Sequence, residues 1–207
     1  MFDRQRNSLK AISWRGASFL IALGVLWIGS VMIGFWCLWL YEWTPGVSSQ
    51  PPFRWPKRTR LPLDRKYPTL VAFIHPHCPC SRATLSELKR ALPPRVTGVR
   101  THVVFRTPEE PSSNWTDTTN VRHARELPGA SIWMDEAGHE TKLFRATVSG
   151  HVVLYRPSGR RVFSGGITGS RGHEGANAGR TALMEWICDQ ASQVRETPVY
   201  GCPLFSN

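Results

Sequence analysis

A long apolar stretch near the N-terminus limits most strongly how this chain folds. The 26 residues Gly16–Tyr41 carry no charge, and Leu, Ile, Val, Phe and Trp dominate them. About 20 apolar residues in a helix span the hydrocarbon core of a bilayer, so this stretch is long enough to cross a membrane with some tilt. A soluble domain rarely buries an uncharged helix of this length. We therefore expect a transmembrane anchor over residues 16–41.

The flanks of this stretch predict its orientation. A cleaved signal peptide has a shorter apolar core and a small-residue exit site, whereas this stretch ends in the aromatic sequence Trp39–Trp43, which is typical of a membrane interface. Four basic residues precede the stretch, and residues 42–53 carry one acid and no base. The excess of positive charge predicts that residues 1–15 are cytoplasmic and that residues 42–207 lie outside, in a periplasmic or other extracytoplasmic space. Cys37, inside the stretch, is interpreted as a small hydrophobic residue.

The overall charge does not by itself indicate a partner. The chain has 26 Lys and Arg against 15 Asp and Glu, a net charge of +11, which would suit a phosphate-rich partner or an anionic membrane surface. Outside the N-terminal flank, however, the basic residues are scattered, as they are on an ordinary solvated surface. We therefore predict no nucleic-acid partner. Five cysteines are too few for a disulfide-dense scaffold.

The rest of the chain is expected to contain one domain between two irregular segments. Residues 42–66 are rich in proline, which disfavours helices and central strands, and so predict a tether. Residues 67–195 are expected to form the domain and residues 196–207 a tail. Hydrophobic patterns predict strands over 69–75, 99–106, 130–134, 151–156 and 160–163, and helices over 81–92, 115–127 and 180–194, with a turn and a short helix over 135–145. This order predicts the α/β class, with a mixed sheet and helices on both faces.

A cysteine motif lies between the first predicted strand and the first predicted helix. The sequence there is His75-Pro76-His77-Cys78-Pro79-Cys80-Ser81. Backbone N–H groups at the start of a helix stabilise a thiolate and lower the pKa of a cysteine. The two cysteines are therefore candidates for disulfide exchange or for binding a soft metal. The alternative is a pair of unreactive structural cysteines in a turn.

The strand, the cysteine motif and the helix together resemble the thioredoxin-like superfamily, in particular its membrane-anchored TlpA and redoxin type. Residues 130–144 and 149–166 are similar to further stretches of that family. The chain is most similar to the RedB-type subset, whose HPxCPC, GGIT and RGHxG segments correspond to His75–Cys80, Gly165–Thr168 and Arg171–Gly175. The resemblance implies a thioredoxin-like mixed sheet, thiol–disulfide exchange with a protein thiol or disulfide substrate, and no cofactor.

The resemblance also implies roles for individual residues. Cys78 would attack as a thiolate, Cys80 would resolve the mixed disulfide, and Ser81 with the helix N-terminus would stabilise the negative charge. The chain departs from the thioredoxin pattern at two places. Its motif is Cys-x-Cys, with Ser81 where the second cysteine is usual, and Gly150, followed by His151, stands where the family has a cis-proline.

These departures leave a second hypothesis open, namely a copper or zinc chaperone similar to the Sco type. Thiolates together with imidazoles suit Cu(I) or Zn(II). The candidate ligands are Cys78, Cys80, His75, His77 and His151. A third hypothesis is an interaction module that keeps only the fold.

Two late features carry further alternatives. Cys188 could form a disulfide with Cys202 and tie the tail to the last helix, or Cys202 could act as a resolving thiol for Cys78. The glycine-rich segment Gly165–Gly175 lacks the Gly-Lys-Ser/Thr ending of a phosphate loop. It is interpreted as a connector to the last helix or as a cover over the cysteine site.

Overall fold

The structure is a computed structural model that describes residues 2–92, 98–188 and 192–205, with side chains from Gly16 onward. The chain divides into two units, Met1–Tyr41 and Glu42–Asn207. The first unit belongs to helix α1 (Phe2–Trp43). The part Gly16–Trp43 is long and apolar enough to cross a membrane, and its large apolar side chains are exposed. These are the length and composition of a membrane anchor or of a signal sequence.

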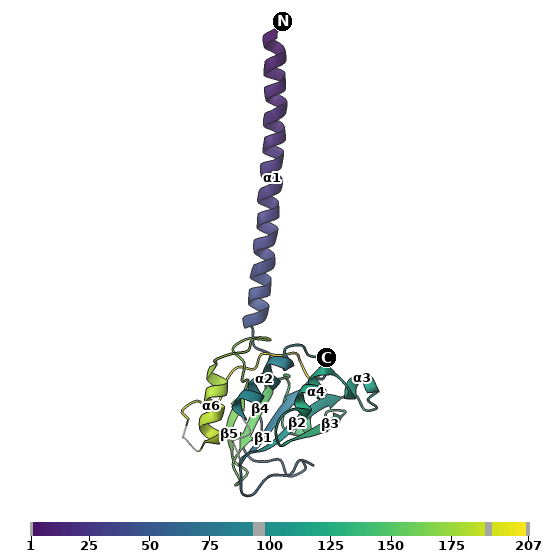
Figure 1. The fold of residues 1–207 in the computed structure, drawn as a ribbon, viewed down its shortest axis with the longest axis vertical. Coiled ribbons are helices and arrows are strands. Elements are labelled where there is room, and N and C mark those ends of the chain that lie inside the picture. Colours follow the sequence, from purple (N-terminus) through teal and green to yellow (C-terminus); the bar gives the residue numbers. More distant parts are fainter. Residues whose placement is uncertain (1, 93–97, 189–191, 206–207) are drawn as a thin grey trace. The chain divides into compact units, whose positions relative to one another are not determined.

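The second unit is built on a five-stranded mixed sheet with the order β3-β2-β1-β4-β5 (Figure 1). The central strand β1 (Thr69–Ile74) pairs in parallel with β2 (Arg100–Thr107), which pairs in parallel with β3 (Ala130–Glu136). On its other side β1 pairs antiparallel with β4 (His151–Tyr155), which pairs antiparallel with β5 (Arg161–Gly165). The predicted mixed sheet is thus confirmed, and the ends of each strand fall within two residues of the predicted ones.

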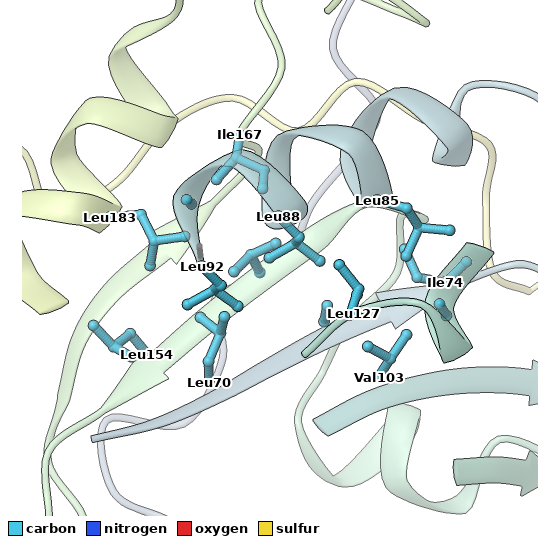
Figure 2. Packing of buried hydrophobic residues seen from close by; sticks show 14 of the residues in the cluster. Leu70, Ile74, Leu85, Leu88, Leu92, Val103, Leu127, Leu154, Ile167 and Leu183 are labelled. Atoms are coloured by element: carbon cyan, nitrogen blue, oxygen red, sulfur yellow. The ribbon is translucent and has the colours of Figure 1, made fainter. Parts of the chain in front are cut away.

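One face of the sheet is covered by helices α2 (Ser81–Ala91), α4 (Thr119–Arg125) and α6 (Ala178–Ile187). The apolar residues of α2 recur at helical spacing, so they share one side of the helix. Figure 2 shows Leu85 and Leu88 of α2 packed with Leu70 and Ile74 of β1 in a cluster of buried residues. This packing fixes the start of α2, and with it the cysteine motif, at the carboxyl end of the central strand.

The helix predicted over 115–127 is instead two short helices, α3 (Ser113–Thr116) and α4. The hydroxyl of Thr118 accepts a hydrogen bond from the backbone N–H of Val121 at 3.3 Å. This cap satisfies a donor that would otherwise lack a partner at the helix end, so a new helix begins there. The hydrophobic pattern continues across the break, which explains why it predicted one helix.

The last helix begins and ends earlier than predicted. The side chain of Asn177 caps α6 by accepting a hydrogen bond from the N–H of Arg180 at 2.8 Å, so the helix starts at Ala178. It ends at Ile187, and Ser192–Val194 are not helical. Residues 189–191 of the predicted helix lie outside the described residues.

The opposite face of the sheet is covered by α5 (His139–Leu143) and by irregular chain. Trp55 packs edge-on against Phe144 and Tyr155, with ring centroids 5.2 and 5.0 Å apart, and Leu61 is buried. The segment predicted to be a free tether over 42–66 therefore forms part of the domain. Its prolines prevent regular structure, but its few apolar side chains still bury themselves against the sheet.

The C-terminal tail is also part of the fold. Val199 and Leu204 are buried, and the carbonyl of Val199 accepts a hydrogen bond from the N–H of Gly46 at 2.9 Å. The compact unit thus extends on both sides of the expected 67–195 domain, from Glu42 into the tail. The tail also brings a third sulfur atom, that of Cys202, to the cysteine motif.

Candidate active site at the cysteine motif

The cysteine motif lies in the turn between β1 and α2. Cys78 is 2% exposed, Cys80 is half-buried, and Ser81 is the first residue of α2. The N–H of Ser81 donates to the carbonyl of Cys78 at 3.1 Å, so the turn leads directly into the helix. The amide of Asn120 on α4 donates to the carbonyls of Pro76 and Cys78 at 3.0 and 2.9 Å. The side chain of Asn120 thus fixes the turn from a neighbouring helix. No sequence motif predicted this role.

Ser149, just before β4, contacts both ends of the cysteine motif. Its hydroxyl accepts a hydrogen bond from the N–H of His75 at 2.7 Å and lies 2.7 Å from the hydroxyl of Ser81. The next residue, Gly150, has a φ of 90° and donates its N–H to Phe73 of β1 at 2.8 Å. A side chain at Gly150 would also press on Thr84 of α2. The chain thus passes close to the motif at Ser149 and Gly150, and the described residues contain no cis peptide bond.

Cys202 from the tail lies against Cys78. The two sulfur atoms are 2.8 Å apart, whereas Cys188 is exposed at the end of α6. Of the two alternatives for the late cysteines, the structure therefore brings Cys202 to Cys78 and leaves Cys188 apart. The sequence suggested Cys202 only through the even number of cysteines outside the membrane segment.

The surroundings of Cys78 favour its thiolate. The pKa of Cys78 is lowered to about 5: the contact with the Cys202 thiol is the main cause, the hydroxyl of Ser81 and nearby backbone N–H groups act in the same direction, and burial opposes them. The same contact, and then burial, raise the pKa of Cys202. Burial, and then the charge on Cys78, raise the pKa of Cys80. The site therefore separates one thiolate from two protonated thiols near neutral pH.

A cation lies beside the two protonated thiols. Arg171, from the RGHxG segment, donates from its guanidinium to the carbonyl of Gly201 in the tail. Its positive charge partly offsets the effects that raise the pKa values of Cys80 and Cys202. The glycine-rich segment therefore reaches the cysteine site, as expected if it acts as a cover.

A buried carboxylate fixes that segment to α2. Glu87 is fully buried, and its oxygens accept hydrogen bonds from the N–H of Gly175 at 2.8 Å and from Arg180 at 2.5 Å. Arg90 also pairs with it. A buried charge needs such partners, because burial without them is costly. The segment is thus anchored at its C-terminal end while Arg171 contacts the tail.

The histidines of the metal hypothesis do not form one ligand set with the cysteines. His75 and His77 pack against the ring of Trp115, at centroid distances of 5.5 and 4.7 Å, and Nδ1 of His75 accepts the N–H of His77 at 3.1 Å. His151 lies on β4 and pairs its Nε2 with the hydroxyl of Ser164 at 2.8 Å. Within the part of the chain that the structure describes, no three His, Cys, Asp or Glu residues are placed to hold a metal ion.

Comparisons with known proteins identify the fold. No family model matches the sequence, and no curated protein matches it. An uncharacterised conserved protein from Geobacillus kaustophilus has a similar structure, with a TM-score of 0.55 and 17% identity over 80% of this chain and 93% of that chain. A hypothetical protein from Sinorhizobium meliloti 1021 has a TM-score of 0.54 and 16% identity over 78% and 93%. A secreted disulfide oxidoreductase from Mycobacterium tuberculosis has a TM-score of 0.42 and 15% identity over 61% and 84%.

The chain has the predicted α/β, thioredoxin-like fold, with a mixed five-stranded sheet and flanking helices. At these levels of identity the comparisons identify the fold and not the activity. The reaction therefore has to be argued from the cysteine site.

Proposed function

We propose that this protein is a membrane-tethered thiol–disulfide oxidoreductase that acts outside the cytoplasm on a protein thiol or disulfide. The observation that carries the proposal is the pairing of Cys78 with a second thiol, at the start of a helix, with a pKa lowered to about 5. The thiolate is the nucleophile in disulfide exchange. A second thiol nearby can release the substrate in the next step, once that thiol has lost its proton.

The arrangement supports exchange more strongly than metal transport. Exchange needs a stabilised thiolate and one further thiol, and Cys78 has both Cys80 and Cys202 nearby. A metal carrier of the kind expected from the sequence needs imidazole ligands beside the thiolates, and His151 is engaged with Ser164 instead. In this proposal the hydroxyl of Ser81 stabilises the thiolate of Cys78, whose pKa it helps to lower.

The proposed location rests on α1 and on the charge around it. Gly16–Trp43 serves as an uncleaved anchor, with the basic residues 1–15 in the cytoplasm. A reporter that is active only outside the cytoplasm, fused after Asn207, is expected to be active. Activity of a cytoplasm-specific reporter at the same position would contradict this orientation.

The activity is tested with the full-length protein in detergent, by following reduction of insulin disulfides with dithiothreitol as the electron donor. The Cys78→Ser variant is expected to show only the rate of dithiothreitol alone, because the attacking sulfur is lost. The matched control is Cys188→Ser, which removes an exposed thiol away from the site and should retain the parent rate. Equal rates for parent and Cys78→Ser, both above the dithiothreitol background, would contradict the role of Cys78.

A further inference from the structure

The tail that carries Cys202 is bound in the manner of a strand, through a single β-bridge and the backbone hydrogen bonds on either side of it. The N–H of Ser149 donates to the carbonyl of Cys202, and the N–H of Leu204 donates to the carbonyl of Thr147, both at 2.8 Å. Val148 and Pro203 form the antiparallel bridge between them. The residues that lead into β4 thus offer a strand edge, and the protein's own tail is added to it.

Contacts on both sides of Cys202 fix this strand in register. Arg171 donates to the carbonyl of Gly201, and Leu204 is 1% exposed among the apolar residues of the second cluster. A side chain at Gly201 would collide with the carbonyl oxygen of Ser149, so only glycine allows this close approach. The register places the sulfur of Cys202 2.8 Å from that of Cys78.

The same strand closes the site to other proteins. Cys78 is 2% exposed, and a substrate sulfur must come to the position that the sulfur of Cys202 occupies. A substrate that brings a cysteine on an extended segment would find at Thr147–Ser149 the backbone partners that the tail now uses. The tail and such a substrate therefore compete for one edge.

We propose that the segment Gly201–Leu204 is an internal substitute for the substrate, which covers Cys78 at rest and supplies Cys202 as the resolving thiol. This inference rests on the proposed function and defines its substrates as extended, cysteine-containing segments that add to the edge Thr147–Ser149. In this inference Cys202, and not Cys80, resolves the mixed disulfide between Cys78 and the substrate.

The reaction balances with these groups. The Cys78 thiolate attacks one sulfur of a substrate disulfide, which forms the mixed disulfide and releases the other substrate sulfur as a thiolate that takes a proton. The tail then returns to its edge, and Cys202, after losing its proton, attacks the sulfur of Cys78. The second substrate sulfur leaves and is protonated. The substrate gains two electrons and two protons, the Cys78–Cys202 pair becomes a disulfide, and an external dithiol must reduce it.

The experiment uses full-length protein in detergent in which Cys37, Cys80, Cys188 and Cys202 are replaced by serine, so that Cys78 is the single thiol. The probe is the capped peptide Gly-Cys-Pro-Leu, which has the sequence of Gly201–Leu204, with its cysteine joined to 2-nitro-5-thiobenzoate. Attack by Cys78 releases the coloured thiolate, which is followed at 412 nm. A second peptide carries an N-methyl group on its leucine and so lacks the donor to Thr147.

A strand-adding substrate should react at least about tenfold faster than its N-methylated form, because a lost hydrogen bond to a closed site costs about that factor. Adding Leu204→Ala should speed the reaction by about tenfold or more, since it loosens the tail. The control is Leu63→Ala, which truncates a partly buried leucine packed against the same cluster outside the tail and should leave the rate unchanged. Equal rates for both peptides would overturn the inference, and the peptide comparison does not depend on how well either leucine variant folds.

The outcome separates this inference from the proposed function. If Cys78 reacts with neither peptide and also not with the small disulfide 5,5′-dithiobis(2-nitrobenzoate), Cys78 is no exchange nucleophile and both proposals fail. If it reacts with the small disulfide and equally with both peptides, the exchange activity stands and the role of the tail is wrong.

Discussion

The two faces of the sheet are covered in different ways. On one face, α2, α4 and α6 present apolar residues at regular spacing to the strands. On the other, most of the cover comes from the Pro-rich segment and the tail, which are irregular and contribute isolated side chains such as Trp55 and Leu204. The regular face positions Cys78 at the start of a helix, and the irregular chain brings Cys202 to it. The difference shows that the thiol beside Cys78 comes from the part of the domain with the least regular structure.

The largest expected effect concerns the pKa of Cys78. It tests whether Cys202, from the irregular tail, determines the protonation state of the cysteine that precedes α2. The thiol of Cys202 is the main cause of the lowered pKa of Cys78. Replacing it with alanine should raise the pKa of Cys78 from about 5 towards the ordinary value of about 8.5. Each unit of this rise corresponds to about 1.4 kcal/mol between the two protonation states.

The measurement is the thiolate absorbance at 240 nm of the reduced full-length protein as a function of pH, with Cys78→Ser subtracted. Cys188→Ala, measured against the same variant with Cys78→Ser added, is the control and should leave the midpoint assigned to Cys78 unchanged, because Cys188 is exposed at the end of α6. A midpoint for Cys78 that stays near pH 5 in Cys202→Ala would mean that the helix start alone produces the thiolate.

The second effect tests whether the Pro-rich segment contributes to the stability of the domain. Leu61 is 3% exposed, so Leu61→Ala should lower the free energy of unfolding by about 3 kcal/mol, as for other buried leucines. Val47→Ala, in the same segment but 92% exposed, should change it by less than about 0.5 kcal/mol. Urea denaturation of the full-length protein in detergent measures both. A tether would give two small effects of similar size.

The contrast between the faces also explains what the sequence could predict. The five strands and α2 could be predicted from local patterns. Alternation, β-branched residues and helical spacing can each be recognised within a short stretch of sequence. The cysteine motif and Ser81 follow from their place between a strand and a helix. The contacts of Trp55 and Cys202 could not be predicted in this way, since they depend on backbone pairing such as that of Ser149 with Cys202, between segments far apart in the chain.

Asn120 and Ser149 illustrate the same limit within the site. Each is a single polar residue without a motif, and each matters because folding brings it against the turn that holds Cys78. The break between α3 and α4 is different, since Thr118 is a known type of capping residue. There the local signal existed, and the longer hydrophobic pattern outweighed it.

The smallest effect concerns His151, which lies where the irregular chain covers β4. It lines a cavity of about 300 Å³ together with Ser48, Gln50 and Glu196, and its buried Nδ1 has no hydrogen-bond partner among the residues that the structure describes. Burial, and then the charge of Arg161, lower the pKa of His151 to about 4. Between that value and the ordinary value of about 6.5, the unfolded chain binds a proton that the folded chain does not.

The folded protein should therefore lose stability as the pH falls through this window, and the loss should be absent above about pH 7. Between pH 7.5 and pH 5 the contribution of His151 is about 2 kcal/mol. Urea denaturation at the two pH values should show this difference in a Cys78→Ser background, which removes the thiolate that titrates in the same direction. Adding His151→Gln should flatten the dependence by that amount, whereas His123→Gln, at a less buried histidine on α4, should not. An unchanged slope in His151→Gln would mean that water reaches the ring through the cover, and that the irregular face is looser than its contacts indicate.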